Sequence, residues 1–213
     1  MSKCFVAIAG NIGVGKSSLT ALLARRLNWQ PFYEAVAENP YLADFYIDMR
    51  RWSFHSQVFF LTRRVRYQQE LVCTPHPVVQ DRTIYEDAEV FARNLYERGH
   101  MDTRDYATYV ALYEVLRQLL PPPHLLVYLK ASVPVLLQRI ALRGRGFERH
   151  ISPSYLEQLN TLYEHWIATF TLCPVLTIDT DPLDFVHFTA DTEEVVTRIR
   201  DHCAAFLTAG GDL

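Results

Sequence analysis

Residues Gly10-Asn11-Ile12-Gly13-Val14-Gly15-Lys16-Ser17 decide the fold of this chain. They fit the pattern G-x-x-x-x-G-K-[ST], in which backbone N–H groups of a glycine-rich turn surround a phosphate. An apolar run at residues 4–9 precedes the turn, and residues 17–27 carry apolar side chains three and four apart, as in a helix. We therefore predict that residues Gly10 to Ser18 bind nucleotide phosphates, that Lys16 reaches the outer phosphates and that the Ser17 hydroxyl ligates Mg²⁺.

Length and composition favour a single globular domain over residues 1–213, because the chain has 213 residues with 49% hydrophobic content. The net charge is −3 and no basic run occurs, which disfavours a nucleic-acid polymer as partner. No apolar stretch approaches the ~20 residues of a membrane span. The four cysteines are scattered without a C-x-x-C pair, which indicates reduced thiols and argues against a metal site built from them. We expect a cytoplasmic protein without membrane contact.

Short apolar runs alternate with helical patterns along the whole chain, which predicts a doubly wound parallel sheet flanked by helices. The expected strands are residues 4–9, 30–33, 76–80, 125–129 and 175–178. The expected helices are residues 17–27, 39–48, 53–72, 85–96, 103–120, 133–142, 155–171 and 193–207. Ligands of such sheets bind at the carboxyl ends of the strands. That rule selects Gly10, Glu34 and Asp81, each just past a predicted strand.

Three arginines, Arg139, Arg143 and Arg145, favour phosphoryl transfer among the functions that use such a phosphate loop. Arg139 and Arg143 are four apart and share a helix face, and Arg145 continues into a glycine-flanked loop that we expect to close as a lid at about residues 143–150. Arginines stabilise the charge on a transferring phosphoryl group. The alternative is a solvated basic helix end that complements the helix dipole. The guanine-reading motif N-K-x-D is absent, which argues against a GTPase.

Several segments together resemble the deoxynucleoside kinases. They are residues 10–18, Glu34 with Asn39-Pro40, Trp52-Ser53-Phe54 with Gln57, Asp81-Arg82-Thr83, and residues 139–148. The resemblance runs from about residue 4 to residue 185. It implies a P-loop kinase fold with a five-stranded parallel sheet and an arginine-rich lid. It also implies transfer of the ATP γ-phosphoryl group to the 5′-hydroxyl of a deoxyribonucleoside, with Mg²⁺ as cofactor, in a homodimer.

The same resemblance assigns roles to the catalytic and ATP-binding residues. Glu34 is implied to be the general base, and Arg82 to orient that base and the reacting phosphate. Asp81 would hold Mg²⁺ together with Ser17. The residues implied to act on the ATP phosphates are Lys16, Arg139, Arg143 and Arg145, and those implied to wrap the adenine are Asp184 and Phe185.

A second group is implied to bind the nucleoside. Gln57 offers one acceptor and one donor to a base edge, which cannot by itself choose the base. Arg64 and Asp87 are implied to pair across the base, which argues for deoxyadenosine, deoxyguanosine or deoxycytidine over thymidine. We lean to a purine, with deoxycytidine close behind. The residues implied to bind the 3′-hydroxyl are Tyr46 and Glu148, and those implied to wall the base are Trp52 and Phe91.

Two other functions remain open at this stage. A catalytically silent relative could serve as a subunit of a larger assembly, although it would not need Lys16, Glu34, Arg82 and Arg145. A nucleoside monophosphate kinase shares the loop and the lid but requires arginines for the acceptor phosphate. The acceptor region offers only Arg50 and Arg51 for that purpose.

Overall fold

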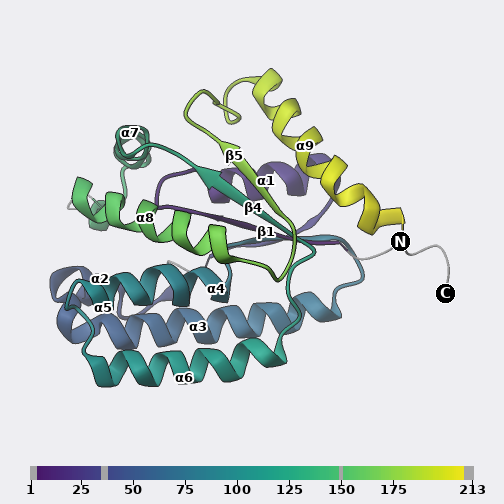
Figure 1. Ribbon diagram of the computed structural model, residues 1–213. Coiled ribbons are helices and arrows are strands. Elements are labelled where there is room, and N and C mark those ends of the chain that lie inside the picture. Colours follow the sequence, from purple (N-terminus) through teal and green to yellow (C-terminus); the bar gives the residue numbers. More distant parts are fainter. Residues whose placement is uncertain (1–3, 35–37, 149–150, 209–213) are drawn as a thin grey trace.

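A parallel sheet forms the centre of the protein, for which the computed structural model describes residues 4–34, 38–148 and 151–208. The described residues contain five strands in the order β2-β3-β1-β4-β5 (Figure 1). They are β1 (Phe5–Gly10), β2 (Gln30–Phe32), β3 (Val78–Asp81), β4 (Leu125–Lys130) and β5 (Val175–Asp179). The central strand β1 pairs in parallel with β3 on one side and with β4 on the other. The predicted doubly wound parallel sheet is confirmed.

Helices cover both faces of this sheet, as Figure 1 shows. One face packs against α1 (Lys16–Leu27), α7 (Val133–Arg143) and α9 (Thr189–Thr208). The other is covered by α3 (Met49–Cys73) and α8 (Pro153–Thr169), and α6 (Thr103–Leu119) packs against α3 on the side away from the sheet (Figure 1). The shorter elements are α2 (Leu42–Ile47), α4 (Ile84–Glu86), η2 (Asp87–Ala92), α5 (Arg93–Glu97) and η3 (Gly146–Glu148). None of the helices in the described ranges is both long and apolar enough to cross a bilayer.

Strand β1 is apolar throughout because it is buried on both faces. Val6 and Ile8 belong to the core cluster beneath α1, α7 and α9, whereas Phe5, Ala7 and Ala9 belong to the opposite cluster. This alternation fixes the direction in which the strand enters the phosphate loop, so the loop starts at a rigid point in the centre of the sheet.

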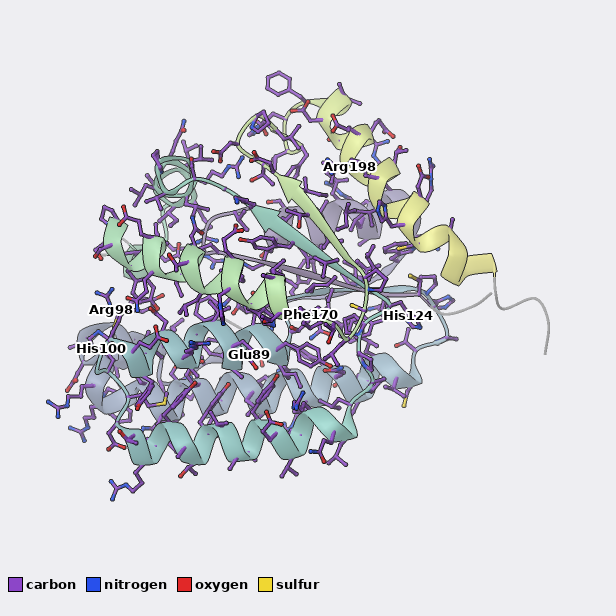
Figure 2. The ribbon with its side chains drawn as sticks, in the orientation of Figure 1. Glu89, Arg98, His100, His124, Phe170 and Arg198 are labelled. Atoms are coloured by element: carbon purple, nitrogen blue, oxygen red, sulfur yellow. The ribbon has the colours of Figure 1, made fainter. Side chains whose placement is uncertain are left out.

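Helix α8 is anchored at its carboxyl end by aromatic contacts. Phe170 lies directly after the helix (Figure 2). Its ring packs edge-on against Tyr85 and Trp166, with ring centroids 5.7 and 5.4 Å apart. Trp166 is itself buried. Such pairs stabilise beyond the area they bury. The anchor fixes α8 relative to α4 and so to the segment that follows β3.

The prediction of a single α-helix at residues 85–96 is wrong in detail, because three helical segments occupy this stretch. Residues Asp87–Ala92 form a π-helix between two short α-helices. The wider turn brings both Asp87 and Phe91 against arginines, since Asp87 pairs with Arg64 and Phe91 lies under Arg82. Such π-bulges occur frequently at functional sites. Apolar periodicity carries no signal for them, because the tertiary contacts of a few residues decide them.

Helix α9 begins at Thr189, four residues before the expected start at residue 193, and two further helix starts differ from the sequence prediction. The helix expected from residue 39 begins at Leu42, because the Asn39 side chain accepts a hydrogen bond from the Tyr41 N–H and forms a turn first. The long helix α3 begins at Met49, four residues before the expected start, because Asp48 caps it by accepting from the Arg51 N–H at 3.1 Å. The latter two differences come from short polar side chains that bond to the backbone.

We predict that Gly13→Ala destabilises the protein more than Gly99→Ala. Both glycines have positive φ, 85° and 71°, so each substitution costs roughly 1–2 kcal/mol of backbone strain. A Cβ at Gly13 would also lie 2.8 Å from Ile140 Cγ1 and 3.0 Å from the Leu136 carbonyl oxygen, whereas nothing lies within 4 Å at Gly99. Urea unfolding should show the larger loss for Gly13→Ala. Equal losses would contradict the close approach of α7 to the phosphate loop.

Candidate active site

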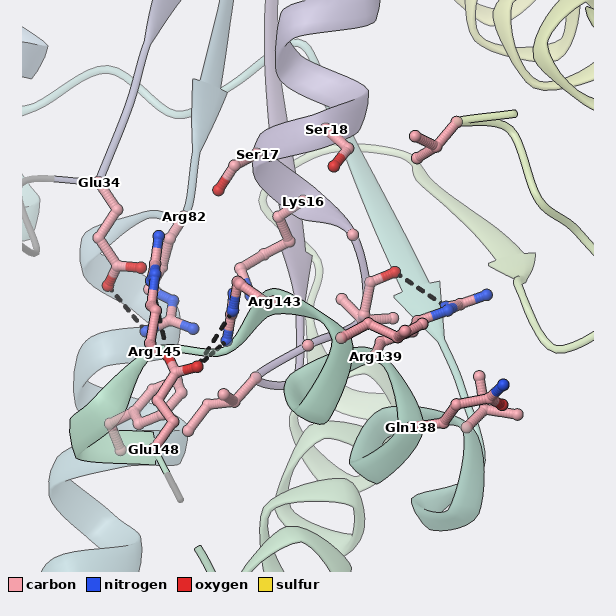
Figure 3. Close-up of a pocket in the computed structure, with 18 of the residues that line it drawn as sticks. Lys16, Ser17, Ser18, Glu34, Arg82, Gln138, Arg139, Arg143, Arg145 and Glu148 are labelled. Carbon is pink, nitrogen blue, oxygen red and sulfur yellow. Dashed lines mark hydrogen bonds and ion pairs between the residues drawn. The ribbon is translucent and has the colours of Figure 1, made fainter. Parts of the chain in front are cut away.

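A cavity of about 770 Å³ opens at the carboxyl ends of the strands. Its walls come from the phosphate loop, Glu34, α2, α3, η2, α7, residues 143–148 and residues 181–187. Figure 3 shows part of this lining, including Lys16, Glu34 and Arg143. The structure thus joins segments that lie more than 170 residues apart in the chain. The predicted site residues that line it are Ile12, Gly13, Val14, Gly15, Lys16, Ser17, Ser18, Glu34, Tyr46, Gln57, Arg82, Asp87, Phe91, Arg139, Arg143, Arg145, Glu148, Asp184 and Phe185.

Lys16 lies inside the phosphate loop. Its Nζ donates to the carbonyl oxygens of Gly10 and Asn11 at 2.7 and 3.0 Å. Burial lowers the pKa of Lys16 to about 8, and the charge of Arg82 acts in the same direction. The Lys16 side chain is 7% exposed, so the ammonium group is held in place by the loop that it serves.

Ser17 and Asp81, the residues expected to hold Mg²⁺, bring two side-chain oxygens together. The Ser17 hydroxyl donates to Asp81 Oδ2 at 2.5 Å, while the buried Oδ1 has no hydrogen-bond partner among the described residues. Burial raises the pKa of Asp81, which a nearby cation would offset. No cluster of three or more metal-binding side chains occurs in the described ranges. Two protein oxygens suit Mg²⁺, which keeps waters and phosphate oxygens as its other ligands.

Glu34 is the centre of a buried ion-pair network. Its Oε1 accepts from Arg82 Nη1 at 2.9 Å and from Arg64 Nη2 at 3.0 Å. Burial acts to raise the pKa of Glu34, but the charges of Arg82 and Arg64 outweigh it, with Lys16 adding to them, and lower the pKa to about 2. Glu34 is therefore ionised and held in one orientation at every physiological pH.

The predicted pair of Arg64 and Asp87 is present in the structure. Arg64 Nε bonds to Asp87 Oδ2, and Arg64 Nη1 donates to the carbonyl oxygens of Asp81 and Arg82 at 3.2 Å each. The Arg64 side chain is 3% exposed and is absent from the cavity wall, whereas Asp87 lines the wall. Within this pair it is Asp87 that faces the cavity.

Arg82 adopts a left-handed backbone conformation, with φ of 68°. Its N–H bonds to the Ile8 carbonyl at 2.9 Å, and its guanidinium carbon lies 4.1 Å from the centroid of the Phe91 ring. A left-handed arginine is strained and persists only where surrounding contacts hold it, which is characteristic of active sites. The conformation directs the guanidinium toward Glu34.

Arg143 and Arg145, which belong to the expected lid, converge on Glu148 (Figure 3). Arg143 donates to Glu148 Oε2 through Nε and Nη2 at 3.1 and 2.7 Å, and Arg145 Nη1 lies 3.5 Å from Oε1. Burial raises the pKa of Tyr46, with Tyr155 and Glu148 acting in the same direction, which places Tyr46 near Glu148. Of the expected lid, residues 149–150 lie outside the described residues.

Arg139 contacts the walls of the cavity rather than its open side. Its Nη1 donates to Val14 O and Thr180 Oγ1, and its Nη2 donates to Thr180 O and Leu183 O, at 2.7–3.2 Å. Four of its five N–H donors are thereby used. Arg139 ties the phosphate loop to the segment after β5, and a direct phosphate contact stays a prediction.

The two predicted residues after β5, Asp184 and Phe185, lie in different surroundings. The Phe185 ring is buried and packs on the phosphate loop, since a Cβ at Gly15 would lie 2.9 Å from it. The Asp184 carboxylate turns toward His187, whose Nδ1 lies 2.8 Å away. The structure therefore places the Phe185 ring against the loop and leaves Asp184 at the rim.

The structure does not bring Trp52 to the cavity. Its ring stacks on Tyr41, with centroids 5.7 Å apart, and contacts His55. Phe45 and Phe60 line the cavity instead, and the sequence analysis missed both. The signal for Phe60 was its position three residues after Gln57, on the same helix face.

Gln57 is buried in the cavity wall with an unused acceptor. Its side chain is 5% exposed, and Oε1 has no hydrogen-bond partner among the described residues. Buried polar groups of native proteins are bonded in the great majority of cases. The orphaned amide oxygen thus fits a role that is completed by a bound molecule.

Comparison with known proteins agrees with this geometry. The deoxynucleoside kinase family model matches residues 6–204. The chain belongs to the deoxynucleoside kinase family. This deoxynucleoside kinase is 41% identical to the deoxyadenosine/deoxycytidine kinase of Bacillus subtilis, over 91% of this chain and 90% of the relative. It is 34% identical to the deoxyguanosine kinase of the same organism, over 92% and 96%.

A solved structure shows the same fold. The deoxyadenosine kinase of M. mycoides, with the products dCMP and dCDP bound, superposes with a TM-score of 0.82 at 30% identity, covering 92% of this chain and 99% of the other. The P-loop kinase fold of this deoxynucleoside kinase is thereby established independently of its motifs.

We predict that Glu34→Gln lowers the stability of the deoxynucleoside kinase in a pH-dependent way. The folded-state pKa of Glu34, about 2, lies below its ordinary value of 4.5, so its ionisation contributes roughly 3 kcal/mol above pH 4.5. The contribution is lost as the pH falls toward 2. In urea unfolding, the difference in the free energy of unfolding between wild type and variant should be constant from pH 7 to 5 and should become smaller below pH 5. The exposed Glu38→Gln serves as control, and a difference that persists unchanged at pH 3.5 would contradict the low pKa.

Proposed function

We propose that this kinase transfers the γ-phosphoryl group of ATP to the 5′-hydroxyl of a deoxyribonucleoside. The observation that carries the proposal is that Glu34 and the phosphate loop face one cavity of about 770 Å³. Small-molecule sites span roughly 300–1,000 Å³, so this cavity is large enough for a nucleoside beside the ATP phosphates.

Glu34 has the position and the charge that the general base requires. It is ionised and fixed by two arginines, so it accepts a hydrogen bond from the 5′-hydroxyl before reaction. The proton passes to Glu34 as the bond from the hydroxyl oxygen to the γ-phosphorus forms and the bond to the β-phosphate oxygen breaks. Products are the deoxynucleoside monophosphate and ADP.

The positive charges around the cavity stabilise the transferred group. Lys16, Arg82, Arg143 and Arg145 all line it. Their charges oppose the negative charge that spreads over the phosphoryl oxygens during transfer. Mg²⁺, held by Ser17 and Asp81, would neutralise further charge on the ATP phosphates.

We further propose that the preferred base carries an exocyclic amino group. The Asp87 carboxylate in the wall accepts hydrogen bonds only, and the orphaned Gln57 Oε1 is an acceptor as well. Adenine, guanine and cytosine each present an amino donor, whereas thymine presents none. The order that we propose is deoxyadenosine or deoxyguanosine first and deoxycytidine close behind. The relatives named above act on these nucleosides.

A nucleoside monophosphate kinase fits the cavity less well. Arg50 and Arg51 were the candidates for an acceptor phosphate, but both are exposed and neither lines the cavity. Arg51 lies over the Trp52 ring instead, 5.0 Å from its centroid. A silent assembly subunit is disfavoured because Lys16, Glu34 and Arg82 are assembled around the cavity.

A homodimer and a cytoplasmic location are part of the proposal. Helix α6 exposes an apolar stripe of Leu112, Val115 and Leu119, and α3 exposes Val72. Exposed apolar stripes of this kind mark protein interfaces, and we propose that a second copy covers them.

All four cysteines are free thiols, as a reducing compartment maintains them. The lid at about residues 143–150 would close over the bound substrates within a single kinase domain.

A substrate panel tests the reaction. With labelled ATP, deoxyadenosine, deoxyguanosine and deoxycytidine should be phosphorylated, thymidine poorly and dAMP not at all. Glu34→Gln should lower kcat by roughly 10²–10⁴-fold while the nucleoside Kd changes little, because the amide retains shape but loses basicity. Glu38→Gln, at an exposed residue paired with Arg63, is the matched control. A loss below tenfold would remove Glu34 from the base role, and turnover of dAMP would favour the monophosphate kinase.

A double substitution tests base choice. Asp87→Ala alone should impair every substrate, because it leaves the buried Arg64 without its partner. Arg64→Met with Asp87→Ala removes both charges, so kcat/KM for thymidine should rise relative to kcat/KM for the purine nucleosides. The measurement is kcat/KM for four deoxynucleosides in wild type, single and double variants. An unchanged ranking in the double variant would make the pair purely structural.

A further inference from the structure

Glu86 is a buried carboxyl group that the proposed chemistry does not use. It is 0% exposed and lies outside the cavity wall, one helical turn after Arg82. Its Oε1 is 2.5 Å from the Tyr163 hydroxyl oxygen, and its Oε2 has no hydrogen-bond partner among the described residues. The Tyr163 hydroxyl also lies 2.8 Å from the Gly10 carbonyl oxygen, at the start of the phosphate loop.

The number of protons in this chain of groups restricts their roles. A tyrosine hydroxyl donates one hydrogen bond, and the Gly10 carbonyl can only accept. If Tyr163 donates to Gly10, then the contact between Tyr163 and Glu86 requires a proton on Glu86. Arg82 Nε lies 3.2 Å from Glu86 Oε1 without the alignment of a hydrogen bond, so Glu86 contacts Arg82 while Arg82 Nη1 gives its hydrogen bond to Glu34.

Burial of Glu86 favours the same protonation state. It raises the pKa of Glu86 to about 7, against the charges of Arg82, Lys16 and Arg64 and the hydrogen bond that joins Glu86 to Tyr163. An unpaired buried carboxylate oxygen is costly, and a neutral carboxyl group avoids most of that cost.

Helix α8 holds the phosphate loop at a second point. Asn160, three residues before Tyr163, accepts from Asn11 Nδ2 at 2.7 Å, and Leu156 O accepts from the same nitrogen at 3.0 Å. One face of α8 thus bonds to both Gly10 and Asn11. This helix follows the lid directly in the chain, and the aromatic anchor at Phe170 fixes its other end.

We propose that Glu86 is a positioning residue for phosphoryl transfer: as a neutral acid it donates to Tyr163, Tyr163 donates to the Gly10 carbonyl, and this chain sets Arg82 relative to the phosphate loop. The proposal rests on the kinase function proposed above. The Gly10 carbonyl also accepts from Lys16, so the chain extends from Arg82 to the phosphate-binding lysine. A neutral Glu86 leaves the charge of Arg82 to Glu34 and to the transferred phosphoryl group.

Four variants test the chain. Glu86→Gln keeps a neutral donor of similar shape, Glu86→Leu removes it, and Tyr163→Phe removes the link to Gly10. Glu89→Gln makes the same chemical change on the same helical segment at a half-buried residue outside the cavity wall (Figure 2). Each variant is assayed for kcat, for KM of ATP and of the nucleoside, and for Tm.

The expected pattern separates positioning from simple structural support. Glu86→Gln and Glu89→Gln should stay within about threefold of wild type, whereas Tyr163→Phe and Glu86→Leu should lose roughly tenfold in kcat/KM for ATP, as for one broken buried hydrogen bond. The nucleoside KM should be unchanged. The double variant Glu86→Gln/Tyr163→Phe should equal Tyr163→Phe alone, because both act through one chain. A Glu86→Gln variant as impaired as Glu86→Leu would overturn the proposal, as would a fully active Tyr163→Phe.

Infrared difference spectroscopy tests the proton itself and needs no turnover. Wild type should show a protonated carboxyl stretch at neutral pH that is absent from Glu86→Gln and retained in Glu89→Gln. A carboxylate band in its place would overturn the assignment. Because this readout is independent of activity, it distinguishes failure of the Glu86 proposal from failure of the proposed kinase function.

Discussion

The pairing of Glu34 with Arg64 and Arg82 is the interaction on which the rest of the site depends. The three side chains come from the end of β2, from α3 and from the end of β3, so each strand and helix must deliver its charge to one point. Buried charge without a partner is strongly disfavoured. The pairing therefore fixes the register of α3 against the sheet. Arg64 also pairs with Asp87 in η2.

The phosphate loop depends on a different constraint, which is space. Gly10 has φ of 144°, and a Cβ there would lie 2.5 Å from the Leu129 carbonyl oxygen of the neighbouring strand. Gly15 has φ of 109°, with the Phe185 ring against its Cα. Glycine alone satisfies the conformation and the close approach together. The loop is thus a packing element of β4 and of the segment after β5, as well as the phosphate-binding loop of the proposed function.

Side chains that donate to backbone carbonyls assemble the remaining walls. Arg139 of α7 bonds to Val14 and to the segment after β5, while Tyr163 of α8 bonds to Gly10. Lys16 bonds within the loop itself. These bonds connect the phosphate loop to helices from the second half of the chain. They make the position of the loop a property of the whole fold, which suits a site where small displacements reduce the rate greatly.

The sequence by itself determined the parallel sheet, the phosphate loop and the groups at the strand ends, because apolar periodicity, glycine spacing and strand polarity act locally. It also indicated that Arg64 and Asp87 belong together. Only the tertiary structure decided that Trp52 stacks on Tyr41 away from the cavity, that Arg139 donates to backbone carbonyls and to the Thr180 hydroxyl, and that residues 87–92 form a π-helix. It also revealed Glu86 and Tyr163. Each of these depends on contacts between residues distant in the chain, and neither spacing nor propensity encodes which partner a buried polar group finds.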